Sequence, residues 1–84
     1  MDETAKWIQK CLSEGRFRLS IHAGERGSQR FVSENDIRHC GKTAKSIKYQ
    51  HSKDTWRVIG KDSDNEILNV ICAVREALLI VTVY

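Results

Sequence analysis

The sequence contains no proline, no low-complexity run and no internal repeat. Because nothing in it resembles a linker, we expect residues 1–84 to form a single domain. A chain of this length buries about 60–65% of its unfolded surface, which leaves one core and little room for a deep pocket. Its small size therefore favours a shallow groove as the site, better suited to a polymer than to an enclosed metabolite.

The sequence also lacks any segment that resembles a signal peptide or a membrane span. It begins Met-Asp-Glu without an uninterrupted apolar stretch, and its longest apolar run, residues 77–81, is far too short to cross a bilayer. We therefore expect a cytoplasmic protein with no membrane partner.

Cysteine is scarce and has no Cys-x-x-Cys spacing. An odd number of cysteines without a secretion signal predicts reduced thiols, and each one occupies an apolar position that favours burial: Cys11, Cys40 and Cys72. His39 and Cys40 are neighbours, but adjacent helical side chains point about 100° apart and suit a shared metal poorly. We expect no metal site and no cofactor.

Positive charge, in contrast, is concentrated in the middle of the chain. The net charge is +3, yet residues 16–61 carry eleven Lys and Arg against four acidic residues, and they hold all three histidines. The segments on either side, residues 1–15 and 62–84, are net negative. This asymmetry predicts a partner with phosphates or an acidic surface. Ordinary solubility charge is the alternative.

Local signals predict three helices. The first spans residues 3–14 and ends at Gly15, because its apolar residues form one stripe: Trp7, Ile8, Cys11 and Leu12. Ser20 is a suitable N-cap for the second, in which Gly24 and Gly27 predict either close approach by another backbone or a short, irregular helix. The third spans residues 34–40. It begins with a Ser33–Asp36 capping box and is expected to end at Gly41.

Alternating polarity predicts the strands. Residues 16–20 form a short strand between the first two helices, and a four-stranded antiparallel meander follows the third helix. The meander strands are residues 46–49, 55–61, 67–74 and 77–84. The last two are apolar at nearly every position, which is typical of central strands covered on both faces. The fold class is therefore α+β, with the helices before the meander.

The second predicted helix carries a candidate site. His22, Arg26 and Arg30 fall four residues apart on one side, with Gln29 between the last two. Like charges at this spacing repel, while a neighbouring Arg favours the neutral imidazole that can accept a proton. The pattern therefore suits an anion such as a phosphodiester. The alternatives are a solvated basic face, a structural histidine, and an Arg26 that braces the fold against Asp62 or Glu66.

Four motifs together resemble a family of small bacterial proteins of unknown function related to the RelE and BrnT toxins. They are Ser20-x-His22-Ala23-x-x-Arg26-x-x-x-Arg30, Ser33-x-x-Asp36-Ile37, Trp56-Arg57-Val58-x-Gly60-x-Asp62 and Ile80-Val81-Thr82-Val83-Tyr84. The resemblance covers residues 16–84. The chain departs from it at Gly24, where relatives have a bulkier residue, and at Asn65, which stands for a turn glycine and tolerates the same left-handed backbone.

The resemblance implies a RelE/BrnT-like fold and a metal-independent endoribonuclease of the mRNA interferase type. Its partners would be RNA, free or bound to the ribosome, and a cognate antitoxin. Cleavage by the RNA's own 2′-hydroxyl needs a base, cations around the phosphorus and an acid. We assign His22 as the base, Arg26 and Arg30 to the phosphate, and Arg57 and Tyr84 as transition-state contact and proton donor. Lys61 and Gln29 would contact the RNA. A non-catalytic module that binds nucleic acid or an acidic protein is the alternative, and a subunit that pairs through its sheet edge is the third reading.

Overall fold

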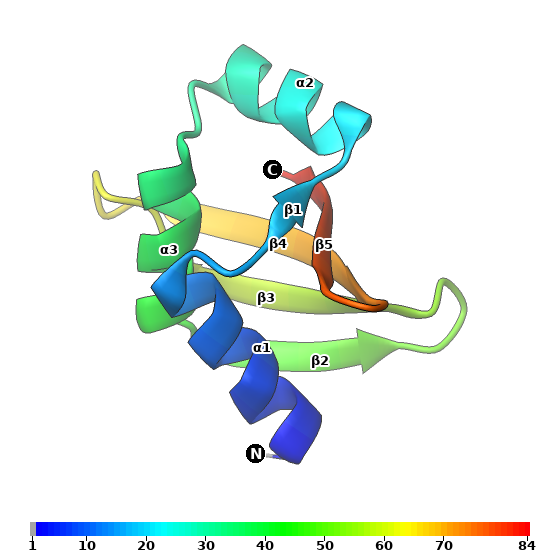
Figure 1. Cartoon of the computed structure of the whole chain (residues 1–84). Coiled ribbons are helices and arrows are strands. Elements are labelled where there is room, and N and C mark those ends of the chain that lie inside the picture. The colour runs from blue at the N-terminus through cyan, green and yellow to red at the C-terminus, as the bar shows by residue number, and fades with distance from the viewer. Residues whose placement is uncertain (1) are drawn as a thin grey trace.

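The computed structural model describes residues 2–84, and of residues 27 and 30 it describes the backbone alone. The fold is α+β, as predicted: a helix, a short strand and two more helices precede four consecutive strands (Figure 1). In chain order they are α1 (Glu3–Glu14), β1 (Arg18–Leu19), α2 (Ile21–Arg30), α3 (Glu34–Lys42), β2 (Ser46–Gln50), β3 (Thr55–Lys61), β4 (Ile67–Val74) and β5 (Leu78–Val83). None of the described helices is long and apolar enough to cross a bilayer.

The strands form one mixed sheet in the order β1-β5-β4-β3-β2. The predicted antiparallel meander of β2 to β5 is confirmed, and so are the bounds of β3 and β4. The short strand β1 joins the meander by pairing parallel to β5, with Arg18 opposite Leu79. This pairing converts four antiparallel strands into a five-stranded sheet with the earliest and latest strands side by side.

Helices α1 and α3 pack together on one face of the sheet, and glycines allow their close approach. A Cβ atom on Gly41 would collide with the Leu12 side chain of α1, and one on Gly60 of β3 would collide with the Cys40 carbonyl of α3. The prediction that Gly41 ends the third helix is therefore wrong. The helix continues to Lys42, and the Thr43 N–H caps it by donating to the His39 carbonyl at 2.9 Å.

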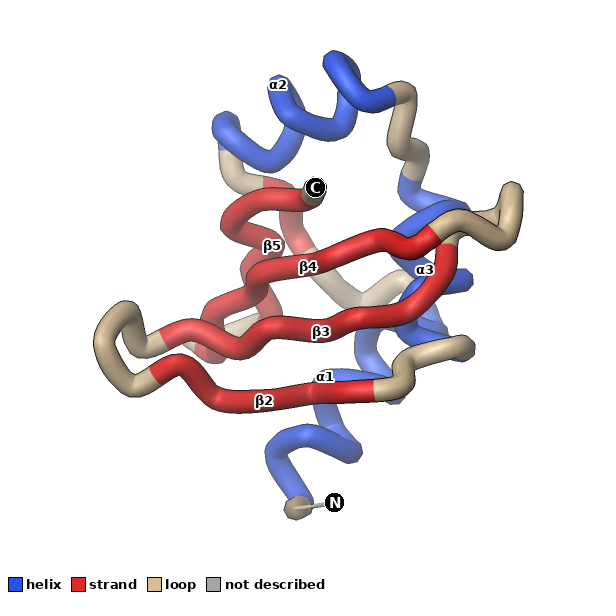
Figure 2. The backbone as a smooth tube through the Cα atoms, turned by 180° about the vertical axis from the view of Figure 1, so that it is seen from behind, coloured by secondary structure: helices blue, strands red, loops and turns tan. Residues whose placement is uncertain are grey.

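The opposite face of the sheet carries no helix, as the view from behind shows (Figure 2). Helices therefore provide the predicted cover on one face of β4 and β5 only. Leu68 and Val70 are fully buried on the helix side. Ile71 points to the other side, where it is 8% exposed because side chains of neighbouring strands shield it. An apolar run thus reports burial, and it does not say which element provides it.

Helix α2 lies at the β5 edge, beside the C-terminal end of the chain (Figures 1 and 2). Ser20 fixes this position, because its hydroxyl accepts from the Ala23 N–H and donates to the Val81 carbonyl, each at 2.9 Å. The predicted N-cap is thereby confirmed. A Cβ atom on Gly24 would meet nothing within 4 Å, so close approach of another backbone does not explain that glycine. The surroundings of Gly27 lie outside the described part.

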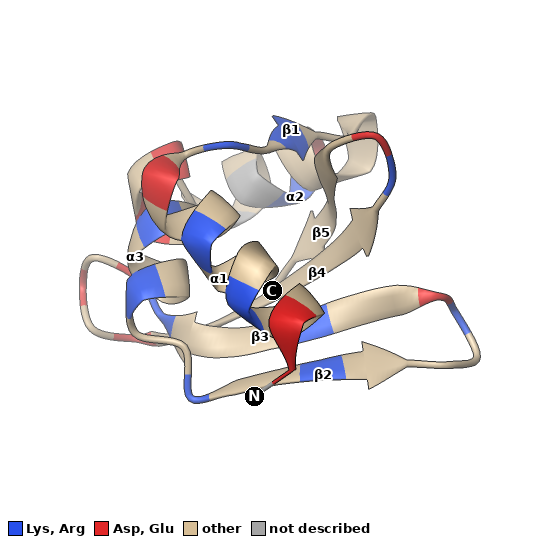
Figure 3. Cartoon of the chain, turned by 60° about the horizontal axis from the view of Figure 1, so that its bottom comes forward, with Lys and Arg blue, Asp and Glu red and all other residues tan. Residues whose placement is uncertain are grey.

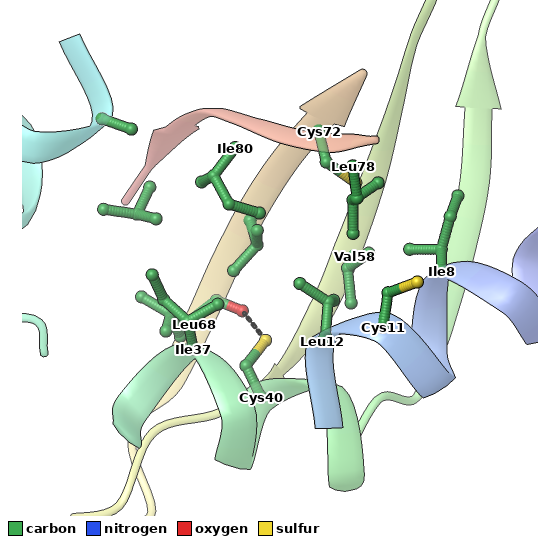
Figure 4. Close-up of a cluster of buried hydrophobic side chains, with 13 residues drawn as sticks. Ile8, Cys11, Leu12, Ile37, Cys40, Val58, Leu68, Cys72, Leu78 and Ile80 are labelled. Atoms are coloured by element: carbon green, nitrogen blue, oxygen red, sulfur yellow. Dashed lines mark hydrogen bonds between the residues drawn. The ribbon is translucent and has the colours of Figure 1, made fainter. Parts of the chain in front are cut away.

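One apolar cluster fills the space between the sheet and α1, α3 and the start of α2 (Figure 4). All three cysteines are free and buried, as predicted. Burial raises the pKa of the Cys40 and Cys72 thiols to about 12. The Cys40 thiol donates to the Leu68 carbonyl at 3.4 Å, which ties α3 to β4. Trp56 is partly buried and packs against this cluster.

Candidate nucleic-acid interface

All the cationic residues within the strands share the helix-free face. Successive strand residues alternate between faces, and Val58, Gly60 and Leu78 pack toward the helices. Alternation and register therefore place four cations on the opposite side: Arg18, Lys48, Arg57 and Lys61. We call this side of the sheet, with its four cations, the open face. The described strands contain no Asp or Glu, and acidic positions lie in helices and turns (Figure 3).

Two of these cations are direct cross-strand neighbours. Lys48 of β2 pairs in register with Arg57 of β3. Like charges directly opposite each other destabilise a sheet, and the strands supply no carboxylate to offset the repulsion. Fold stability therefore does not explain the pair, whereas a bound polyanion would.

Arg57 is held at the centre of the open face by two contacts. Its Nε donates to the Asn69 Oδ1 of β4 at 3.1 Å, and its guanidinium carbon lies 5.6 Å from the centre of the Tyr84 ring. Tyr84 is placed by backbone hydrogen bonds of 2.7 and 2.9 Å with Asn69. Among the described residues, no hydrogen bond uses the two terminal nitrogens of Arg57. This is the fork that binds phosphate oxygens in a bidentate manner.

The surface shows two shallow hollows, both formed by strands and turns. One of about 350 Å³ lies on the open face between Gln50 and Tyr84. The other, of about 700 Å³, lies at the β4–β5 turn between Arg18 and Arg75. Neither of these two hollows is lined by a residue of α2.

The candidate residues on α2 are separate from Arg57 and its contacts Asn69 and Tyr84, although α2 lies next to them. His22 and Gln29 are exposed and Arg26 is half-buried. The side chain of Arg30 lies outside the described part. Among the described residues His22 makes no hydrogen bond, and Arg26 makes no ion pair with Asp62 or Glu66. Helix α2 lies beside the C-terminal end of β5, where the chain ends at Tyr84 (Figures 1 and 2).

Other motif residues build the framework that carries this face. The Asp36 carboxylate, buried at the start of α3, accepts from the Ser33 N–H at 2.8 Å and from the Ser63 N–H at 3.0 Å, and both hydroxyls also bond to it. Burial opposes its ionisation, but these hydrogen bonds outweigh burial and lower its pKa to about 2. The predicted capping box is thereby confirmed, and it also anchors the β3–β4 turn.

The β3–β4 turn is itself shaped by Asp62 and Asn65. Asp62 Oδ1 accepts from the backbone N–H groups of Asp64 and Glu66, each at 2.9 Å. Asn65 adopts the left-handed conformation with φ of 65°, as predicted for the residue that stands in place of a glycine. The motif residues of this turn therefore have structural roles.

Sequence reasoning missed three residues of the open face: Arg18, Lys48 and Asn69. The alternation of β2 is the signal that could have placed Lys48 on the same side as Arg57. Asn69 gave no local signal, because its role depends on the β3–β4 and β4–β5 registers. Among the described residues, no three His, Cys, Asp or Glu side chains are grouped so that they could hold a metal ion.

A family model described as a domain of unknown function, DUF4258, matches residues 19–84. The match runs from the end of β1 to the C-terminus and leaves α1 outside. It therefore includes α2 and, except for Arg18, every residue of the open face named above. No curated protein and no solved structure is significantly similar to the chain.

Proposed function

The chain belongs to the DUF4258 family, and from its basic open face we propose that it is a metal-independent endoribonuclease of the RelE/BrnT type. The substrate is messenger RNA, free or on the ribosome. A cognate antitoxin that presents an acidic surface masks the same face.

The observation that carries this proposal is the one-sided distribution of strand cations. Lys48 and Arg57 face each other without a carboxylate on the sheet, and Lys61 continues the same side of β3. A single-stranded polyanion that lies across β2 and β3 would relieve the repulsion and gain charge-assisted hydrogen bonds. The shallow relief of the face fits an extended chain better than a compact ligand.

The chemistry follows from the groups that flank this path. The RNA 2′-oxygen attacks the adjacent phosphorus while His22 removes its proton. Arg57 and Arg26 stabilise the negative charge that develops on the phosphoryl oxygens. The bond from phosphorus to the 5′-oxygen then breaks, and Tyr84 donates a proton to that oxygen. The products are a 2′,3′-cyclic phosphate and a 5′-hydroxyl. Arg30 and Gln29 of α2 extend the contact with RNA.

The deciding experiment compares two exposed histidines. Purified protein is incubated with end-labelled RNA, with and without ribosomes, as wild type, His22→Gln and His51→Gln. Loss of a general base lowers the rate by about 10²–10⁴-fold, so cleavage by His22→Gln should fall by that factor while RNA affinity is retained. The His51→Gln control, in the β2–β3 turn, should cleave as the wild type does. Equal rates for all three proteins would contradict the assignment of His22.

A non-catalytic binding module is the second candidate, and the hydrogen-bonded Arg57 favours it as much as it favours catalysis. This function predicts salt-sensitive RNA binding and intact RNA under every condition, with ribosomes included. Induced expression then separates the two functions in cells. Growth arrest that His22→Gln abolishes supports the enzyme, whereas harmless expression of both forms supports the module.

A further inference from the structure

The smaller of the two hollows, which lies on the open face, is lined by both apolar and polar side chains. Its floor includes the apolar side chains of Ile71 and Val81, from the two central strands. Its polar groups are contributed by Gln50, Thr55 and Thr82. The volume of about 350 Å³ falls within the range of sites for small organic groups, roughly 300–1,000 Å³. A phosphate would gain nothing from the apolar floor, whereas a nucleobase has apolar faces and a polar edge.

Tyr84 connects this hollow to the phosphate-binding fork. It lines the hollow, and its ring also carries the Arg57 guanidinium at 5.6 Å. A phosphate bound by Arg57 would therefore lie beside a base seated in the hollow. Lys53 also lines the hollow and adds a further positive charge to it.

One polar group of the hollow is held in a fixed orientation. The Thr55 hydroxyl donates to the Gln50 Oε1 at 3.2 Å, so the Gln50 amide nitrogen remains a donor. The Thr82 hydroxyl can donate or accept. A donor in a fixed position distinguishes base edges by which acceptors they present.

We propose that this hollow is a nucleobase subsite that gives RNA binding a base preference. The inference rests on the proposed RNA binding and adds specificity to it. Gln50 and Thr82 read the base edge, and Ile71 and Val81 support its flat face. The preference comes from the hollow, and the affinity common to all sequences comes from the four strand cations.

The test measures binding of four RNA oligonucleotides that differ only in one central base. Wild type should prefer one base by about tenfold, because the other bases leave a donor of the hollow without its hydrogen bond. In Thr82→Val and Gln50→Met, affinity for that base should fall to the level of the other three, with the salt dependence unchanged. Thr4→Val, exposed on α1, is the matched control and should keep the preference.

Two different failures separate this inference from the proposed function. Equal affinity of the wild type for all four RNAs, with steep salt dependence, would overturn the subsite and leave RNA binding intact. Absence of RNA binding would overturn both. A preference that survives in Thr82→Val and Gln50→Met, in variants that unfold at the wild-type temperature, would assign the base to another part of the face.

Discussion

Arg57 illustrates how a single side chain acquires a function from its neighbours. It is one of four cations on the open face, but Asn69 holds its Nε and Tyr84 lies against its guanidinium plane. The rotamer entropy that a flexible arginine would lose on binding is thus partly lost already in the folded protein. The guanidinium fork of Arg57 is therefore preorganised for an anion, whereas the side chains of Lys48 and Lys61 are not.

Replacing Arg57 by lysine tests the fork apart from the charge. Arg57→Lys keeps one positive charge but loses the bidentate geometry and the Nε contact, so RNA affinity should fall by about 10–100-fold. The reciprocal change Lys48→Arg keeps the charge at a position where no neighbour orients a guanidinium group. It should therefore alter RNA affinity by less than threefold. Fluorescence anisotropy with a labelled oligonucleotide measures both. Wild-type affinity in Arg57→Lys would show that the face acts through charge alone.

Asp36 is the side chain whose ionisation matters most for stability. Hydrogen bonds from Ser33 and Ser63 outweigh burial and hold its folded pKa at about 2, below the ordinary 3.8. A lowered folded pKa stabilises the protein at pH values above the ordinary one, and this stabilisation is lost as the pH falls through 2. After allowance for solvent screening it contributes about 1–2 kcal/mol at neutral pH.

Asp36→Asn should therefore lower the free energy of unfolding by about 1–2 kcal/mol at pH 7. The difference from wild type should shrink between pH 4 and pH 2, as measured by urea unfolding. Asp64→Asn, exposed in the turn that Asp36 anchors, is the control and should change stability by less than about 0.5 kcal/mol. A deficit for Asp36→Asn that stays constant down to pH 2 would contradict the assigned ionisation.

Among the elements, those with local signals were predicted most closely. Helix α1 has the predicted bounds because its apolar stripe and Gly15 are local, and the start of α3 is set by Ser33 and Asp36. The errors involve contacts between elements. Gly41 continues α3 because Leu12 of α1 packs against it, and β1 joins β5 across most of the chain length. A single sequence does not specify such long-range pairing.

Helix α2 offers a stability test of its glycine. Gly24 is exposed, has no positive φ, and a Cβ atom there would meet open space. Gly24→Ala should therefore raise the free energy of unfolding by about 0.5–1 kcal/mol, because alanine reduces the entropy of the unfolded chain. Gly60→Ala, whose Cβ atom would collide with the Cys40 carbonyl, should instead lower it by about 1–3 kcal/mol. Destabilisation by Gly24→Ala would indicate a contact that the structure lacks.

In the whole molecule, helices α1 and α3 and the strand cations occupy opposite sides of one sheet. The sequence revealed the excess of positive charge and pointed first to His22 and Arg26, because four-residue spacing is visible in a single segment. It assigned Arg57 and Tyr84 to the same site but gave no reason to join Asn69 to them. The three residues come from adjoining segments of the sheet and meet only through strand register. The candidate site was thus predicted in its residue types more than in its assembly.

RNA binding as a function of salt concentration tests the central claim, that the open face binds the RNA backbone. Each phosphate contact with a single strand contributes about 0.7 to the slope of log affinity against log salt. The double variant Lys48→Gln, Arg57→Gln should therefore lose about 1.4 from this slope. The matched control Lys6→Gln, Lys10→Gln removes the same charge from exposed positions of α1, on the helix side, and should keep the wild-type slope. Equal slopes for the two double variants would contradict the account.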